Sequence, residues 1–387
     1  MDYVYLDNAA SSWPKPPGVA RAVAEMIEGN GSNPGRGSHR MAVEAGRTIF
    51  RTRMKLAKLF GISNPNDIAF APNTTAALNA AILGWVRPGD HVVCTAVEHN
   101  SVRRPLEFLR RTKGVRVTYV ETEPDGALDA GRVERAVKEA GARLVVVNHS
   151  SNLLGSVAPL AEIAEAARRS GAALLVDAAQ SAGVLPIDVE ALGIDMLAFP
   201  GHKALYGPQG TGGLYISPRI DLEPVMLGGT GSQSEAAEQP SVRPDRYEAG
   251  TLNTPGIAGL GAGLDYVLAE TPKAICEREW RLTQRMMEGL LRIEGVRVLG
   301  PELGKERTGI VAFIADGADS AEIAFVLDQH FGIAVRAGFH CTPLAHQTAG
   351  TFETGAVRAS VGAFTTEDEA DYFVESVKEA VRTLRGT

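Results

Sequence analysis

Residues 173–203, ALLVDAAQSAGVLPIDVEALGIDMLAFPGHK, form the stretch that most clearly indicates the fold of this chain. It contains two short apolar runs of strand length, 173–176 and 195–199. The first run leads directly into Asp177, and the second leads into His202 and Lys203. In an open α/β sheet, ligands bind beyond the carboxyl ends of the strands, so these polar groups indicate a candidate site.

The same pattern extends in both directions, from about residue 67 to residue 218. Short apolar runs alternate there with stretches of helical period, as in a mainly parallel sheet covered by helices. The other expected strands are 67–70, 91–97, 115–120, 143–147 and 212–216, and the expected crossover helices include 101–113, 130–140 and 159–170. We therefore predict an α/β fold whose large sheet has helices on both faces.

The texture of the sequence changes after Tyr215. Residues 228–256 are rich in Gly, Pro, Ser and Gln and lack an apolar period, which predicts a long functional loop. A helical stretch at 257–293 is followed by expected strands at 296–299 and 309–314 and by expected helices at 320–331 and 367–384. These signals predict a large domain, 1–256, and a smaller α+β domain, 257–387, against which roughly the first 15 residues pack.

The composition excludes several classes of protein. The 387 residues are 44% hydrophobic and 22% charged, and no apolar run approaches the roughly 18 residues that a membrane helix needs. The net charge is −7 and the charges are interleaved, so we expect no nucleic-acid or membrane partner. The first residues, MDYVYLDNAA, lack the apolar core of a secretory signal, so we expect a cytoplasmic protein that acts on small molecules.

Asp177 and Lys203 together suggest a particular cofactor. An unpaired carboxylate at the end of a buried strand costs several kcal/mol, so Asp177 needs a cationic partner. A lysine in a partly dry site has a lowered pKa and can form a Schiff base. Pyridoxal phosphate requires this pairing, because the Asp keeps its pyridine nitrogen protonated and the Lys binds its aldehyde.

Two further motifs fit the same cofactor. Asn73, Thr74 and Thr75 open a helical stretch, 76–83, so their hydroxyls and free N–H groups can hold a phosphate. His99 can lie flat on the cofactor ring. Each motif also has an ordinary structural reading, since a lone strand-end Asp or Thr pair is more often a helix cap and a lone His-Lys pair is usually a surface turn.

The motifs as a set resemble one known family. YLDNAA at the start of the chain, NTTAALN at 73–79, EH at 98–99, SNLLG at 151–155, VDAAQS at 176–181, GHK at 201–203, EAGTLN at 248–253 and VRAGFHC at 335–341 resemble the cysteine desulfurases and selenocysteine lyases of the class V aminotransferase superfamily. They occur in the family's order over nearly the whole chain. The resemblance implies a fold-type I pyridoxal-phosphate enzyme that is a homodimer with its active site at the subunit interface.

The resemblance also implies how the cofactor is held. Lys203 would form the Schiff base, Asp177 would bind the pyridine nitrogen, Gln180 would bind the ring hydroxyl, and His99 would stack on the ring. The phosphate would be held by the second threonine of the Asn-Thr-Thr motif and by the histidine of GHK, with Thr251 reaching it from the partner subunit.

The substrate side is implied in the same way: Asn152 would face the amino acid, and Arg358 would bind its carboxylate.

Three features differ from the usual family pattern, namely Pro200 before GHK, Leu252 in the GTLN motif, and the segment CTPL that begins at Cys341 in place of CxQPL.

The family's nucleophile falls on Cys341, and the surrounding residues agree. Arg336, His340 and His346 are expected to favour the thiolate, which is the attacking form. Cys94 lies in an expected strand and Cys276 in an expected helix, so both are interpreted as structural. A zinc site at His340, Cys341 and His346 is a poor alternative, because a closed structural site needs four ligands.

These observations predict a cysteine desulfurase that converts L-cysteine to L-alanine and holds the sulfur as a persulfide on Cys341 before passing it to a sulfur-acceptor protein. The alternatives are a selenocysteine lyase or another class V β-lyase or aminotransferase-like enzyme on the same fold, and a catalytically silent scaffold.

Overall fold

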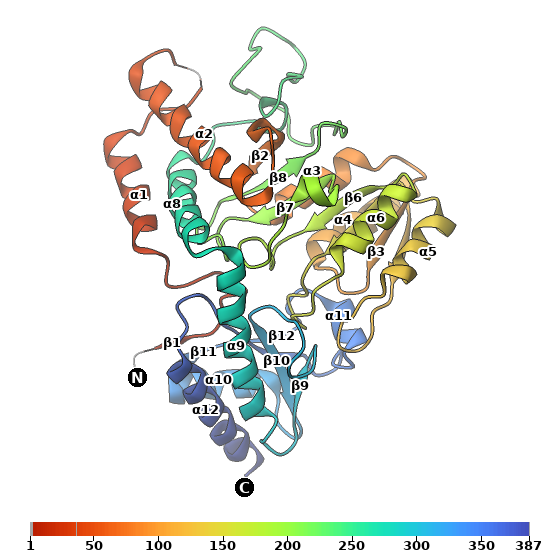
Figure 1. The fold of residues 1–387 in the computed structure, drawn as a ribbon, viewed down its shortest axis with the longest axis vertical. Coiled ribbons are helices and arrows are strands. Elements are labelled where there is room, and N and C mark those ends of the chain that lie inside the picture. Colours follow the sequence, from red (N-terminus) through yellow and green to blue (C-terminus); the bar gives the residue numbers. More distant parts are fainter. Residues whose placement is uncertain (1–2, 36, 387) are drawn as a thin grey trace.

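The computed structural model describes residues 3–35 and 37–386 (Figure 1). The helices are α1 (Pro17–Gly29), α2 (Arg40–Phe60), α3 (Thr74–Trp85), α4 (Asn100–Lys113), α5 (Ala130–Ala140), α6 (Leu160–Arg169), α7 (Val189–Leu192), α8 (Thr254–Glu270), α9 (Pro272–Leu290), α10 (Ser320–Phe331), α11 (Pro343–Thr348) and α12 (Glu367–Arg385), with short 3-10 helices η1 (Pro65–Asp67) and η2 (Asp245–Tyr247). The strands are β1 (Val4–Tyr5), β2 (Ile68–Ala71), β3 (His91–Thr95), β4 (Arg116–Val120), β5 (Leu144–Asn148), β6 (Ala173–Asp177), β7 (Met196–Pro200), β8 (Gly212–Ile216), β9 (Val296–Leu299), β10 (Ile310–Ala315), β11 (Ile333–Ala334), β12 (Arg336–Gly338) and β13 (Ala356–Ser360).

The central sheet has seven strands in the order β2-β8-β7-β6-β5-β3-β4. The pairs among β3, β4, β5, β6 and β7 are parallel, whereas β8 is antiparallel to both of its neighbours, β2 and β7. All strands except β8 therefore run in one direction, and their carboxyl ends meet at one edge of the sheet. This agrees with the predicted mainly parallel α/β fold.

Alternate residues of the strands pack on opposite faces of this sheet. Val145 and Val147 of β5 belong to a core cluster that also contains α2, α5, α6 and α8 residues. Val146 of the same strand belongs to a second cluster that contains α3 and α4 residues. Both faces are covered by helices, which is why the strands are almost continuously apolar.

A smaller unit lies beside the large one, and α9 enters it directly after α8 (Figure 1). Its sheet has the order β12-β13-β10-β9 and is antiparallel throughout. Helices α9, α10 and α12 bury Met286, Leu327 and Phe373 against it. The N-terminal strand β1 pairs with β11, and Val4 and Leu6 belong to the same core cluster.

The expected boundary between the two units, after residue 256, stays a prediction, and the packing of α8 favours a later one. Helix α8 lies against α1 and α2, and its Leu260 and Leu264 belong to the core of the large sheet. Thr271 then has φ 70 and its side chain caps α9. We propose that the division falls at Thr271, so that α8 belongs to the larger unit.

The seven expected strands of the large sheet are all present within two residues of their expected bounds. The single helical stretch expected at 257–293 is wrong, because the left-handed backbone at Thr271 and the following Pro272 break it into α8 and α9. The expected elements do not include helices α1, α2, α7 and α11 or strands β1, β11, β12 and β13. The expected loop at 228–256 contains η2 and the first turn of α8.

Within the described residues, none of the helices combines the length and the apolar character that crossing a membrane requires.

Candidate functional site

One cavity collects most of the site residues predicted from the sequence. It lies beyond the carboxyl ends of β5, β6 and β7 and has an empty volume of about 490 Å³. Its lining contains eight predicted residues: Thr74, Thr75, His99, Asn152, Asp177, Gln180, His202 and Lys203. The parallel strands explain this convergence, because each residue follows a strand that ends at the same edge.

Asp177 and Lys203 each affect the pKa of the other in this cavity. Asp177 is the last residue of β6 and is 2% exposed. Burial raises its pKa to about 6, against the opposing effects of the Ala179 N–H, which donates to Oδ1 at 2.9 Å, and of Lys203. Burial likewise lowers the pKa of Lys203 to about 8, with Arg358 lowering it further and Asp177 raising it. The amine therefore changes protonation near neutral pH.

The side of the cavity that the sequence predicts to hold a phosphate is formed by the start of α3. Asn73 is the helix cap, since its Oδ1 accepts from the Ala76 N–H at 2.9 Å. In the part of the chain that the structure describes, Thr74 Oγ1 and His202 Nδ1 are buried without a hydrogen-bond partner. The Thr74 hydroxyl lies at a helix N-terminus, a position that suits an anionic ligand. Asn73 is thus a helix cap, whereas a ligand role for Thr74 and Thr75 stays a prediction.

His99 both caps α4 and faces the cavity. Its Nδ1 accepts from the Ser101 N–H at 3.0 Å, and it contacts the Ser101 hydroxyl, which in turn contacts Thr75 Oγ1 at 2.8 Å. Burial, followed by the nearby Lys203, lowers the pKa of His99 to about 4. The imidazole is therefore neutral at physiological pH.

Arg358 lies on β13 and is 1% exposed. Its Nη2 donates to Asp7 Oδ1 at 2.8 Å, and its Nη1 donates to the Asn152 backbone carbonyl at 2.9 Å. Its Nε atom has no hydrogen-bond partner among the described residues. The arginine predicted to hold a carboxylate is thus already paired with Asp7.

Cys341 is exposed and lines a second, outer pocket that shares Thr75, His99 and Ser101 with the cavity. Arg336 Nη2 lies 3.8 Å from its Sγ. The two neighbouring histidines do not provide the positive charge that the sequence suggested, because burial lowers the pKa of His340 to about 3 and also lowers the pKa of His346. Of the three expected groups, only Arg336 is a cation beside the thiol.

Thr251 is not part of the cavity of its own chain. It is exposed, and its Oγ1 accepts from Asn33 Nδ2 at 3.4 Å. The other two cysteines also lie elsewhere: Cys94 is buried in the core beneath α3 and α4, and Cys276 is half-buried on α9. The part of the chain that the structure describes contains no group of three or more His, Cys, Asp or Glu side chains able to hold a metal ion.

Several residues of the site carry no role in the sequence prediction. Asp7 lies in the YLDNAA motif and neutralises Arg358. Ser101 joins His99 to Thr75, and its position two residues after the EH motif is the signal for it. Glu98 is fully buried, and its Oε1 accepts from the Thr95 hydroxyl and from the Asn148 N–H, which fixes the ends of β3 and β5 together.

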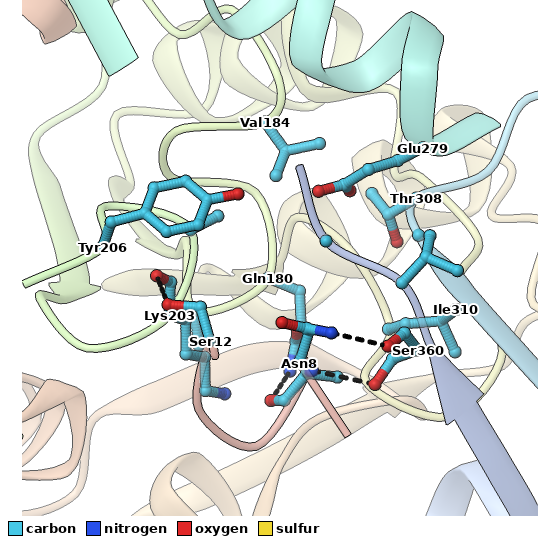
Figure 2. Close-up of a pocket in the computed structure, with 16 residues that line it drawn as sticks. Asn8, Ser12, Gln180, Val184, Lys203, Tyr206, Glu279, Thr308, Ile310 and Ser360 are labelled. Carbon is cyan, nitrogen blue, oxygen red and sulfur yellow. Dashed lines mark hydrogen bonds between the residues drawn. The ribbon is translucent and has the colours of Figure 1, made fainter. Parts of the chain in front are cut away.

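A further small cavity shares Gln180 and Lys203 with the first one and is lined by residues of both units (Figure 2). Figure 2 shows Asn8, Ser12, Gln180, Tyr206, Glu279, Thr308 and Ser360 around it. Gln180 donates from Nε2 to the Ala9 carbonyl at 3.0 Å. Glu279 is 4% exposed, and burial raises its pKa to about 8.

A mainly parallel sheet with a strand-end Asp and Lys in one cavity is the arrangement expected of a fold-type I pyridoxal-phosphate enzyme. Comparison with known families agrees with this class. The aminotransferase class-V model matches residues 4–373, so the chain belongs to the class V aminotransferase family. This confirms the predicted family and fold class.

Within that family, the chain is similar to proteins named as cysteine desulfurases. It is 39% identical to a probable cysteine desulfurase of Methanothermobacter thermautotrophicus, with 98% of this chain and 94% of that protein covered. It is 32% identical to a cysteine desulfurase of Haloferax volcanii, with 98% and 90% covered. The solved apo structure of a cysteine desulfurase from Thermococcus onnurineus NA1 aligns with a TM-score of 0.92 at 34% identity, over 98% of this chain and 95% of that one.

Proposed function

We propose that the protein is a pyridoxal-phosphate-dependent cysteine desulfurase that converts L-cysteine to L-alanine and holds the sulfur as a persulfide on Cys341. One juxtaposition carries the proposal. Lys203 and Asp177 line an inner cavity, while an exposed thiol beside Arg336 lines an outer pocket that shares His99 with it. The similarity to proteins named as cysteine desulfurases supports the choice of substrate.

The residues of the inner cavity fit pyridoxal phosphate. Thr74 Oγ1 and His202 Nδ1 are buried polar atoms that lack partners and would bind the phosphate together with Thr75. Asp177 would hold the pyridine nitrogen, and Lys203 would bind the aldehyde carbon. When bound, the cofactor supplies an electron-poor ring that weakens the bonds to the substrate's Cα.

Lys203 is suited to moving protons on the substrate. Its pKa of about 8 lets the amine take a proton from the substrate's Cα at neutral pH and return a proton in a later step. His99 is neutral, so it adds no positive charge next to the lysine. Gln180 and Asn152 line the same cavity and would orient the ring hydroxyl and the amino acid. Arg358, although paired with Asp7, would bind the substrate carboxylate through its remaining N–H groups.

Cys341 would carry out the sulfur transfer. Its sulfur, with Arg336 Nη2 3.8 Å away, would attack the sulfur of the bound cysteine as the thiolate. A sulfur–sulfur bond forms as the Cβ–sulfur bond breaks, and the electrons of the broken bond stay with Cβ. Cβ then takes a proton and becomes the methyl group of alanine, so cysteine and a thiol give alanine and a persulfide.

A homodimer and a sulfur-acceptor protein are part of the proposal. Thr251 is exposed and outside its own cavity, as expected for a residue that completes the phosphate site of a partner subunit. Val225, Met226 and Leu227, which precede the long loop, are at least half exposed and suit an apolar subunit interface. We further propose that the protein acts in the cytoplasm. A monomer that retains full activity in sedimentation would overturn the dimer.

The direct test of the function uses the purified holoenzyme, L-cysteine and a reductant such as dithiothreitol. Alanine and sulfide in equal amounts are expected, because each turnover releases one of each. Pyruvate and ammonia in place of alanine would instead indicate a β-eliminating lyase. Turnover of selenocysteine that far exceeds that of cysteine would indicate a selenocysteine lyase.

A further inference from the structure

The backbone around Cys341 has an uncommon conformation. His340 has φ 49 and Cys341 has φ 58, so two consecutive residues other than glycine are left-handed. Such a conformation persists only where the surroundings hold it. The carbonyl groups of both residues are held by the large unit: Asn152 Nδ2 donates to His340 O at 2.7 Å, and the Asn100 N–H donates to Cys341 O at 2.8 Å.

Thr342, the residue after the nucleophile, makes a third connection. Its side chain is fully buried, and its Oγ1 lies 3.3 Å from the Val97 carbonyl and 3.2 Å from the Glu98 carbonyl, to which it donates. These carbonyls belong to the turn that leads directly into His99. The Thr342 hydroxyl therefore joins residues 340–342, the nucleophile loop, to the turn that precedes His99, and His99 lines both the inner cavity and the outer pocket.

The hydroxyl does not perform the usual task of a threonine at this position. Thr342 is the N-cap residue of α11, where a threonine side chain normally accepts from the first turn of the helix. Here it makes no such bond. Its one hydroxyl proton is directed to the large unit instead, which separates its role from that of a helix cap.

We propose that Thr342 is a positioning residue for sulfur transfer: its hydroxyl holds Cys341 at a fixed place relative to His99. The inference rests on the proposed function, in which Cys341 is the attacking thiol. Without the hydroxyl, the loop relaxes towards right-handed backbone and the thiol moves away from the cavity. Misplacement of a reacting atom by about 1 Å can cost on the order of 100-fold in rate.

The experiment compares Thr342→Val, which replaces the hydroxyl with a methyl group, with Thr342→Ser, which keeps the hydroxyl. Thr351→Val is the matched control. Thr351 is equally buried in the same segment, but its hydroxyl bonds to His346 and not to the large unit. The first readout is the rate at which iodoacetamide alkylates Cys341 in each protein without added cofactor, followed by mass spectrometry of the Cys341 peptide. The second readout is kcat and KM for alanine formation by the holoenzymes.

Thr342→Val is expected to change the alkylation rate severalfold and to lower kcat by about 10- to 100-fold with little change in KM. Thr342→Ser and Thr351→Val are expected to match the wild type in both readouts. A wild-type kcat and alkylation rate in Thr342→Val would overturn the proposal. If Thr342→Val does not fold, Thr342→Ala, which also lacks the hydroxyl, is measured in its place with the same expected results.

The alkylation rate does not depend on desulfurase chemistry. Failure of the positioning role can therefore be distinguished from failure of the proposed function. If Cys341 is not the nucleophile, Thr342→Val still alters alkylation while alanine formation is unaffected. If only the positioning role is wrong, alkylation is unchanged in Thr342→Val while Cys341→Ser still abolishes alanine formation.

Discussion

Arg358 and Asp7 form an ion pair across the two ends of the chain, with Arg358 Nη2 2.8 Å from Asp7 Oδ1. The arginine lies on β13, whereas Asp7 follows β1 in the N-terminal segment. Loss of one partner of a buried pair is costly, because the other charge is left uncompensated. The N-terminal segment thus helps to fix the residue that we expect to bind the substrate carboxylate.

Arg358→Ala is expected to raise KM for L-cysteine by about 10-fold or more, since a hydrogen bond to a charged group contributes about 1.5 to 3 kcal/mol. Cofactor content, measured from the absorbance of the purified protein, is expected to change little. Asp7→Asn is the control, because it breaks the ion pair but keeps the guanidinium. If both variants lower the melting temperature and neither raises KM, Arg358 is structural.

The wild type is expected to be yellow from its bound cofactor, and Lys203→Ala is expected to lose both this colour and the activity, because the amine that would bind the cofactor is lost. A second lysine lies nearby: Lys15 Nζ donates to the His202 carbonyl at 2.8 Å, and burial lowers its pKa to about 8. Borohydride reduction of the wild type, followed by peptide mapping, is expected to place the cofactor on the Lys203 peptide. Recovery of the label on the Lys15 peptide would show that Lys15, and not Lys203, forms the Schiff base.

Glu279 is expected to make the protein less stable as pH rises. Its folded-state pKa is raised by burial from 4.5 to about 8. Below pH 4.5 the carboxyl is protonated in both states and contributes nothing to the pH dependence. Between 4.5 and 8 the unfolded chain ionises while the folded protein does not, so unfolding is favoured increasingly, by up to about 1.4 kcal/mol per pH unit.

The measurement is the free energy of unfolding of wild type and Glu279→Gln across this pH range. The variant is expected to gain stability relative to wild type as pH rises and to level off above about 8. Glu277→Gln, on the same helix but with an exposed side chain, is the control and is expected to show no such difference. Parallel curves for wild type and Glu279→Gln would contradict the burial argument.

The parts of the site that the sequence predicts are those written in local patterns. Asp177 and Lys203 each follow an apolar strand, and parallel strands end at one edge, so their shared cavity follows from the strand pattern alone. The ion pair between Asp7 and Arg358 joins residues 351 positions apart, and no periodicity marks it. His340 and His346 are near Cys341 in sequence, yet folding buries and neutralises them, which local reading cannot show.

The role of Cys341 separates a desulfurase from other enzymes of the same fold, because only the persulfide route needs a protein thiol. Cys341→Ser is expected to keep the yellow colour, since Cys341 lines the outer pocket and not the cofactor cavity. It is expected to release almost no alanine from L-cysteine, because a hydroxyl does not accept the substrate sulfur. Cys94→Ser and Cys276→Ser are the matched controls and are expected to retain turnover where they fold.

The thiol that receives the sulfur can also be identified directly. Wild type treated with L-cysteine in the absence of reductant is expected to gain about 32 Da, one sulfur atom, on the peptide that contains Cys341. The exposure of Cys341 and the cation at 3.8 Å favour this thiol, whereas burial raises the pKa of Cys94 well above its usual value and that of Cys276 to about 11. Both of those thiols therefore stay protonated and unreactive at neutral pH. Wild-type alanine formation by Cys341→Ser would instead require a lyase that acts through Lys203 without a protein thiol.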